Sequence, residues 1–428
     1  MSRNGEFGDD GPIDTRSASP DRHEDSLSTL LLQDDGHDAF RQPIHGAAPA
    51  LYQTSLFTFG SFEEMRQAIE SKDDAYIYTR GRNPTVRAFE EKIALLEGAQ
   101  DACAFASGMG AIAAVVLGNV RAGDKILCIR NVYPDAYKLM TRFLPKFGVE
   151  TEFVDGTSSQ AVQDRLDDDQ IKLLYLESPT TLLFELQDLE ALCRAARQRG
   201  VVTVVDNSWA TPLGQRPLDH GADLVLHSAS KYLSGHSDVV AGVVAGSSEA
   251  IGRLRDLELM VLGGKLSPFD AWLLLRGLRT LPLRLERHES SARKIADFLA
   301  QQAQITKVHY PGDAGHPQGD LYHKYFSCGG GLLSFELADE AQVEPFVDAL
   351  RVFSLGVSWG GFESLVYPVL MSHLTAGEHS ASRAFGVPRS LVRLHVGLED
   401  PADLITDLAR ALGAVETNAT KGEKAMEV

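Results

Sequence analysis

Two polar side chains that follow apolar runs are the first candidates for chemistry in this sequence. Lys231 comes shortly after DLVLH (223–227), and Asp206 comes directly after VVTVV (201–205). Burial disfavours a charged lysine, so a lysine at the end of a buried strand can act as a neutral nucleophile toward a carbonyl group. A carboxylate at the carboxyl end of a parallel strand lies where open α/β sheets bind ligands. Alone, each also fits a structural role, Lys231 as a solvated strand end and Asp206 as a turn cap.

The pair matches what pyridoxal phosphate (PLP) requires of a protein. The cofactor aldehyde needs a lysine for a Schiff base, and the pyridine nitrogen needs a carboxylate that keeps the ring protonated as an electron sink. Ser228 and Ser230 stand before Lys231 at alternate positions and can donate hydrogen bonds to a phosphate. We therefore expect Asp206 and Lys231 to line one pocket.

A glycine-containing segment, FASGMGAIAAVV (105–116), is the third candidate. Its G-x-G-x-x-A pattern begins at Gly108, between an apolar run and an expected helix. This pattern suits a phosphate held at a helix N-terminus, and it also fits an NAD-binding fingerprint. The fingerprint expects an acid near the end of the next strand, but KILCI (125–129) is followed by Arg130 and Asn131. An NAD-binding oxidoreductase is therefore the weaker alternative.

The elements that must position these residues alternate along the chain. Apolar runs without polar alternation predict strands buried on both faces. Amphipathic stretches at Thr85–Glu97 and Leu189–Gln198 predict helices between them. This order predicts an α/β fold with a mostly parallel sheet. The predicted strands are 125–129, 172–176, 201–205 and 223–227.

The pattern changes after about residue 265. A long helical segment begins at SPFDAWLLLRGLRTL, and the strands LLSFEL (332–337) and LVRLHVG (391–397) follow among further helices. This arrangement predicts a smaller C-terminal domain of α+β type.

Composition limits the classes of function. The 428 residues include 41 Lys+Arg and 59 Asp+Glu, a net charge of −18, which disfavours binding to nucleic acid or to an anionic membrane. No apolar run reaches the roughly 18 residues of a membrane-spanning helix, and no secretory signal is recognisable. The cysteines form no CxxC pair, which argues against zinc or a disulfide framework. We expect a cytoplasmic enzyme without a metal. The cysteines are Cys103, Cys128, Cys193 and Cys328.

From about Ala48 to Leu412 the chain resembles the PLP-dependent trans-sulfuration enzymes, which include cystathionine synthases and lyases and methionine γ-lyase. Several independent motifs in the same order make the resemblance specific. The matching segments are YTRGRNPTVRAFE (78–90), SGMGAI (107–112), ESPTT (177–181), DNSWATP (206–212), HSASKYLSGHSDVVAGVV (227–244), WGGFESL (359–365) and LVRLHVGLED (391–400).

The resemblance implies a fold-type I PLP architecture with Lys231 as the Schiff-base lysine and Asp206 as the partner of the pyridine nitrogen. It implies that Tyr133 stacks on the cofactor ring and assists proton transfer. The residues implied to bind the cofactor phosphate are Gly108, Met109, Ser228 and Ser230.

The resemblance also implies a shared active site. Tyr78 and Arg80 match residues that reach the phosphate of a neighbouring subunit, which implies a homo-oligomer, a tetramer built as a dimer of dimers. Arg393 matches the guanidinium that binds the substrate α-carboxylate. Ser358 and Tyr78 are further expected substrate contacts.

The resulting domain organisation has five parts. They are a disordered acidic arm (1–45), an N-terminal arm that contacts a neighbouring subunit (46–82), a PLP-binding large domain (83–279), a small domain (280–415) and a flexible tail (416–428).

Within the family, three residues favour cystathionine β-lyase. Trp359 and His395 stand where many γ-acting members carry Leu and Ser, and Val357 stands where γ-acting members often carry Glu. We therefore expect β-elimination of L-cystathionine to homocysteine, pyruvate and ammonia. The alternative is γ-elimination or γ-replacement on cystathionine, methionine or a homoserine ester. The YTRGRNPT segment favours this alternative, because it resembles the corresponding segment of γ-synthases and γ-lyases more closely than that of β-lyases. Thr181 replaces an Asn that in many members contacts the cofactor.

Overall fold

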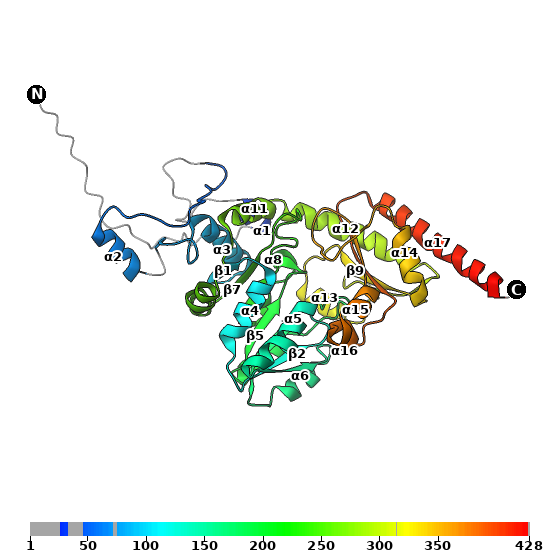
Figure 1. Cartoon of the computed structure of the whole chain (residues 1–428), viewed down its shortest axis with the longest axis horizontal. Coiled ribbons are helices and arrows are strands. Elements are labelled where there is room, and N and C mark those ends of the chain that lie inside the picture. Colours follow the sequence, from blue (N-terminus) through cyan, green and yellow to red (C-terminus); the bar gives the residue numbers. More distant parts are fainter. Residues whose placement is uncertain (1–25, 33–45, 72–74, 314, 427–428) are drawn as a thin grey trace, which may run out of the picture.

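Two β-sheets, formed by separate stretches of the chain, are the framework of the protein (Figure 1). The computed structural model describes residues 26–32, 46–71, 75–313 and 315–426. The strands of the seven-stranded sheet are β1 (Asp101–Phe105), β2 (Lys125–Ile129), β3 (Glu150–Val154), β4 (Ile171–Glu177), β5 (Val202–Asp206), β6 (Leu224–His227) and β7 (Gly242–Gly246). Those of the five-stranded sheet are β8 (Ile305–His309), β9 (Leu332–Leu337), β10 (Ser354–Leu355), β11 (Leu365–Pro368) and β12 (Leu391–His395).

The large sheet has the strand order β1-β7-β6-β5-β4-β2-β3. Strand β7 runs antiparallel to β1 and β6, while the other neighbours are parallel. The expected α/β fold with a mostly parallel sheet is therefore confirmed. Since β1 to β6 all run in one direction, their carboxyl ends meet at the same edge of the sheet.

Helices cover the sheets and connect their strands (Figure 1). The helices up to the end of the large sheet are α1 (Leu27–Leu32), α2 (Phe62–Glu70), α3 (Pro84–Glu97), α4 (Gly108–Asn119), α5 (Pro134–Lys138), α6 (Ser159–Arg165), α7 (Leu189–Gln198) and α8 (Thr211–Gly214). Those that follow are α9 (Ser248–Leu254), α10 (Met260–Leu262), α11 (Pro268–Leu278), α12 (Leu281–Leu299), α13 (Gly319–Tyr325), α14 (Val343–Ala349), α15 (Leu370–Thr375), α16 (Ala381–Ala384) and α17 (Pro401–Met426).

Helix α3 shows how local sequence sets these elements. The Asn83 side chain caps its first turn by accepting a hydrogen bond from the Thr85 N–H at 3.0 Å, and Pro84 occupies the first helical position. Gly98 ends it in a left-handed conformation, with φ of 68°. The predicted helix at Thr85–Glu97 is confirmed to within one residue.

The structure differs from the prediction within the acidic arm (1–45). Residues Leu27–Leu32 form α1, and Leu30 and Leu31 are buried. The Lys92 ammonium on α3 donates a hydrogen bond to the Leu30 carbonyl at 2.8 Å. The leucine-rich run LSTLLL can bury apolar surface, which the polar sequence around it cannot. Residues 1–25 and 33–45 lie outside the described part.

A second difference concerns the predicted tail (416–428). Helix α17 continues through most of this segment and ends at Met426. The segment is free of proline and contains Ala, Glu and Lys, which favour helix once a helix has started.

The expected boundary at 279/280 lies between α11 and α12, and we propose it as the limit of the two domains. The seven-stranded sheet lies before this position and the five-stranded sheet after it. The arm at 46–82 includes α2, none of whose residues is buried and which lies away from both sheets in Figure 1. Among the described residues no helix is long and apolar enough to span a bilayer.

The docking of α1 can be tested with two adjacent leucines. Leu31 is 1% exposed and Leu32 is 62% exposed. We predict that Leu31→Ala lowers the free energy of unfolding by about 2 kcal/mol, the lower end of the range for a buried leucine, because Leu31 packs in the core beside α3. Leu32→Ala should change it by less than about 0.5 kcal/mol. Urea denaturation measures both, and equal effects would show that α1 does not pack as described.

Candidate active site

Most of the expected site residues line one cavity at the carboxyl edge of the large sheet. Its volume is about 380 Å³. Loops that follow β1, β2, β4 and β6, together with the ends of β4 and β5, supply one side. The segment before β11 and strand β12 supply the other. The expected residues that line it are Gly108, Met109, Tyr133, Asp206, Ser228, Ser230, Lys231, Ser358 and Arg393.

Two expected residues are not part of this cavity. Tyr78 and Arg80 are exposed on the N-terminal arm and are absent from the residues that line it. The Arg80 guanidinium lies 5.7 Å from the centre of the Tyr78 ring. A single chain therefore does not bring these two side chains to the cavity.

Lys231 is held in a setting that favours its neutral amine. Its ammonium nitrogen donates a hydrogen bond to the Ser358 hydroxyl at 2.8 Å and lies 5.4 Å from the centre of the Trp359 ring. Burial, together with the positive charge of Arg393, lowers the pKa of Lys231 to about 8. A fraction of this lysine is thus unprotonated near neutral pH and can act as a nucleophile or a base.

Asp206 is fixed at the end of β5. Its Oδ1 atom accepts hydrogen bonds from the Ser208 backbone N–H at 3.0 Å and from the Ser208 hydroxyl at 2.6 Å. The same hydroxyl accepts a hydrogen bond from the Ser228 N–H at 2.7 Å, which ties the loop before Lys231 to β5. Burial raises the pKa of Asp206, while Ser208 counteracts the shift. A cation beside this carboxylate would stabilise its charged form.

The first turn of α4 can hold an anion. The Ser107 side chain caps the helix by accepting a hydrogen bond from the Gly110 N–H at 2.9 Å. The N–H groups of Gly108 and Met109 lie in the first turn, where a helix offers no carbonyl partner. A Cβ atom at Gly108 would lie 2.8 Å from the Ser228 Oγ, so only glycine permits this close approach. The arrangement leaves two N–H donors and a hydroxyl facing one cavity.

The Ser230 hydroxyl is less available to an anion at that site, because it already forms two hydrogen bonds. Its hydroxyl donates to the Ala241 carbonyl at 3.2 Å and accepts from the Ala241 N–H at 2.9 Å. These two bonds connect the Lys231 loop to the start of β7. The main effect of Ser230 in the free chain is therefore to hold the loop in place.

Arg393 lies on β12 at the opposite side of the cavity. Its Nη2 atom donates hydrogen bonds to the carbonyls of Val357 at 2.9 Å and Ser358 at 3.3 Å, and its guanidinium lies 5.1 Å from the centre of the Tyr367 ring. Burial lowers its pKa to about 10, so it remains a cation at neutral pH. No ion pair with Arg393 is found among the described residues, and a carboxylate in the cavity would provide one.

Tyr133 forms part of the cavity wall. Its backbone N–H donates a hydrogen bond to Glu177 at 2.9 Å, and its hydroxyl donates to Asp135 at 3.1 Å. Burial, with the negative charge of Asp135, raises the pKa of Tyr133 to about 12. The free phenol therefore keeps its proton at neutral pH.

Glu177 and Ser208 are two residues of the site for which the sequence alone predicted no role. Glu177 closes β4 as Asp206 closes β5, so the same signal of an acid at the end of a buried strand could have found it. Thr181, which was noted only as a departure from the family, donates a hydrogen bond to Glu177 at 2.5 Å. The contact of Ser208 with Asp206 has a local signal, since a serine two residues after an aspartate often closes a turn.

The three residues that favoured β-lyase occupy different positions. Trp359 lines the cavity beside Lys231. Val357 is 80% exposed and contributes its carbonyl to Arg393. His395 is buried behind the wall, where its ring contacts the Gly361 carbonyl at 3.0 Å. Of the three side chains, only that of Trp359 faces the cavity.

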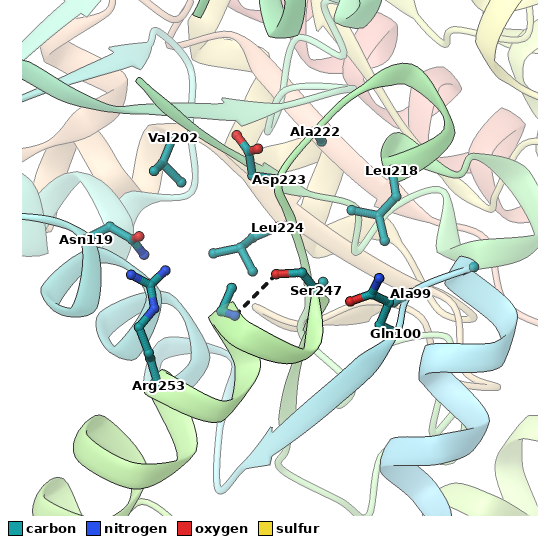
Figure 2. Close-up of a pocket in the computed structure, with 13 residues that line it drawn as sticks. Ala99, Gln100, Asn119, Val202, Leu218, Ala222, Asp223, Leu224, Ser247 and Arg253 are labelled. Carbon is teal, nitrogen blue, oxygen red and sulfur yellow. Dashed lines mark hydrogen bonds between the residues drawn. The ribbon is translucent and has the colours of Figure 1, made fainter. Parts of the chain in front are cut away.

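A second cavity of about 380 Å³ lies at the opposite edge of the sheet. Figure 2 shows Arg253, Asn119 and Asp223 around it, with Leu224 between them. None of the expected site residues lines it, because the amino ends of β5 and β6 point to this edge. In the described part of the chain, no group of three or more His, Cys, Asp or Glu side chains could hold a metal ion.

Comparisons with known proteins find similarity along most of the chain. A family model described as Cys/Met metabolism PLP-dependent enzyme matches residues 29–413. The L-methionine gamma-lyase of Pseudomonas putida is 39% identical over 383 residues, 88% of this chain and 96% of that protein. A cystathionine beta-lyase of Lactococcus lactis subsp. cremoris is 39% identical over 363 residues, 85% of this chain and 93% of that protein.

A solved structure shows the same fold. The crystal structure of cystathionine gamma synthase from Xanthomonas oryzae pv. oryzae, in complex with aminoacrylate and cysteine, has a TM-score of 0.84 and 37% sequence identity. The alignment covers 92% of this chain and 99% of that chain.

The setting of Lys231 predicts a pH dependence in the chain freed of cofactor. The rate at which an amine-specific reagent modifies Lys231 should increase with pH, with a midpoint near pH 8, because burial and the positive charge of Arg393 favour the neutral amine. Arg393→Gln removes a like charge and should move the midpoint to higher pH. Peptide mass spectrometry measures the rate at each pH, with exposed Lys172 reporting the reagent's own dependence. A wild-type midpoint near the ordinary lysine value of about 10.4 would contradict this prediction.

Proposed function

The chain belongs to the Cys/Met metabolism family of PLP-dependent enzymes, and from this we propose that it is a carbon–sulfur lyase that cleaves L-cystathionine by β-elimination. The products would be homocysteine, pyruvate and ammonia. The observation that carries the proposal is the wall formed by Ser358 and Trp359 beside Lys231.

The cavity fits the cofactor of the family. The open N–H groups at the start of α4 and the Ser228 hydroxyl suit a phosphate, and Asp206 suits a protonated ring nitrogen. Lys231 suits the aldehyde carbon. The dinucleotide interpretation is not retained, since β1 is an edge strand beside antiparallel β7, whereas the fingerprint strand of an NAD domain lies within a parallel sheet.

The residues of this chain divide the chemistry between them. Arg393 would bind the substrate α-carboxylate, with a planar fork that matches that group. Lys231, whose pKa is already lowered, would take the proton from Cα. Bound PLP supplies the electron sink that stabilises the negative charge left on Cα. Tyr133, protonated at neutral pH in the free chain, could donate a proton to the departing sulfur.

The distinction between β- and γ-elimination rests on the number of proton transfers. Loss of sulfur from Cβ requires only the removal of the Cα proton, whereas loss from Cγ requires a further transfer from Cβ. The indole of Trp359 gives one side of the Lys231 amine an apolar cover. This supports β-elimination. The alternative is γ-elimination or γ-replacement, which is favoured by the equal identity to a methionine gamma-lyase.

We further propose that two subunits share each active site, within a tetramer built as a dimer of dimers. Tyr78 and Arg80 lie on an exposed arm outside the cavity of their own chain. The neighbouring α2 exposes Phe62, Met65 and Ile69, which would be covered in an assembly. All four cysteines are free thiols, which supports the proposed cytoplasmic location.

The keto acid formed from L-cystathionine tests the reaction. We predict pyruvate as the keto acid, because sulfur leaves Cβ, and not 2-oxobutyrate, which elimination at Cγ would produce. Mass spectrometry of the derivatised keto acids identifies both. Lys231→Ala should form neither and serves as the control. Formation of 2-oxobutyrate alone would show that the enzyme is a γ-lyase.

Mixed oligomers test the shared site. Lys231→Ala chains and Arg80→Ala chains should each have little activity alone. If Arg80 acts on the neighbouring subunit, a mixed dimer contains one intact site, and co-expression in equal amounts should restore about a quarter of the wild-type specific activity. Steady-state assays of the whole co-expressed pool, without selection for mixed oligomers, measure this. Absence of recovery would place Arg80 in the site of its own chain or outside the sites altogether.

A further inference from the structure

We propose that Glu177 is a positioning residue that holds a proton in the folded enzyme and fixes Tyr133 and Thr181 at the wall of the active site. Its carboxyl group bonds both segments. One oxygen accepts a hydrogen bond from the Tyr133 backbone N–H at 2.9 Å, and the other contacts the Thr181 hydroxyl at 2.5 Å. These two residues come from different loops, so Glu177 connects one to the other.

The strand register places Glu177 beside another carboxylate. Glu177 on β4 is the direct partner of Asp206 on β5, and neighbouring parallel strands are about 4.8 Å apart. Both residues are buried, and no ion pair with Glu177 occurs in the described part of the chain. Two adjacent buried carboxylates without a cation between them disfavour double ionisation, so one of them retains a proton.

The cofactor and the rotatable hydroxyl of Thr181 indicate which of the two retains it. Each carboxyl group accepts two hydrogen bonds that favour its charged form, Asp206 from the Ser208 N–H and hydroxyl and Glu177 from the Tyr133 N–H and the Thr181 hydroxyl. Asp206 must also be charged to hold the ring nitrogen of the cofactor. The Thr181 hydroxyl can accept a hydrogen bond as well as donate one, so it remains bonded to a protonated Glu177. The proton therefore belongs on Glu177.

The titratable side chains that interact most strongly with Glu177 agree with this assignment. Asp206 faces it from β5, Cys128 from β2 and Tyr175 from its own strand, and none of them carries a positive charge. Burial first, and the charge of Asp206 second, raise the pKa of Glu177 from 4.5 to about 8. The hydrogen bonds from the Thr181 hydroxyl, and from the backbone of Tyr133 and Thr181, lower this pKa only in part.

The role follows from what Glu177 contacts. Tyr133 starts α5, and its ring lines the cavity. Its N–H would otherwise face the buried end of β4 without a partner, which would favour a different path for the loop. Thr181 stands where many relatives carry the Asn that contacts the cofactor. Here its hydroxyl is directed to Glu177 instead. Glu177 lies at the cavity and thus sets the position of the aromatic wall through its bonds to Tyr133 and Thr181.

The matched variants are Glu177→Gln, Glu177→Ala and Glu185→Gln. Glutamine reproduces a protonated carboxyl, with one acceptor for the Tyr133 N–H and one donor for Thr181. Alanine removes both contacts. Glu185 accepts a hydrogen bond from the Asn131 side chain nearby at 2.8 Å and does not line the cavity, so it controls for the chemical change alone.

The first measurement is the melting temperature of the full-length holoenzyme from pH 5 to pH 9. A proton kept in the fold but released on unfolding makes wild-type stability fall as pH rises from about 4.5 to about 8. Glu177→Gln lacks this loss, so its melting temperature relative to wild type should increase over that range and then level off. Glu185→Gln should show no such trend. A flat or decreasing difference for Glu177→Gln would overturn the proposal.

The second measurement is kcat at pH 7, recorded as total keto acid. Glu177→Gln should keep kcat close to that of the wild type, whereas Glu177→Ala should lower it by about tenfold, as expected when a buried N–H loses its partner. Equal loss in the two variants would overturn the proposal. This arm rests on the proposed lyase activity, but it counts pyruvate and 2-oxobutyrate together, and the melting arm needs no substrate. A wrong assignment of β-elimination is therefore distinguishable from a wrong role for Glu177.

Discussion

Removal of charged groups from water at the carboxyl edge of the large sheet is the constraint on which the site depends. Burial lowers the pKa of Lys231 and Arg393 and raises the pKa of Asp206, so each is shifted toward its neutral form. Such shifts are costly for folding, and they persist only where the surrounding backbone is held firmly. The apolar strands β4, β5 and β6 provide that backbone.

The two sheets supply different halves of the cavity. The large sheet and its loops supply Lys231, Asp206 and the anion-binding turn at Gly108, which together suit the cofactor. Strand β12 of the five-stranded sheet supplies Arg393, and the segment between β10 and β11 supplies the Ser358–Trp359 wall, which suit the substrate. Changes in the second half can therefore alter the substrate while the cofactor chemistry is retained. This division gives a physical reason why one family contains lyases and synthases.

Short-range patterns accounted for much of the fold. Strands β2 and β9 and helix α7 have the predicted bounds, and the predicted strands at β4, β5 and β6 are present with ends that differ by at most one residue. Continuous apolar runs define such strands without reference to their neighbours. Helix α1 was missed because its stability comes from Leu31 packed on α3 and not from its own short sequence.

The sequence by itself determined the family, the parallel core and the placement of Lys231 and Asp206 in one pocket. These features depend on residue types at strand ends and on motifs read in order. Only the tertiary structure decided that Glu177 lies beside Asp206, that Arg393 is held by the carbonyls of Val357 and Ser358, and that Tyr78 and Arg80 remain outside the cavity of their own chain. Strand register and the approach of two sheets create these contacts between residues that are distant in sequence. The local sequence pattern does not specify which distant strand becomes the neighbour.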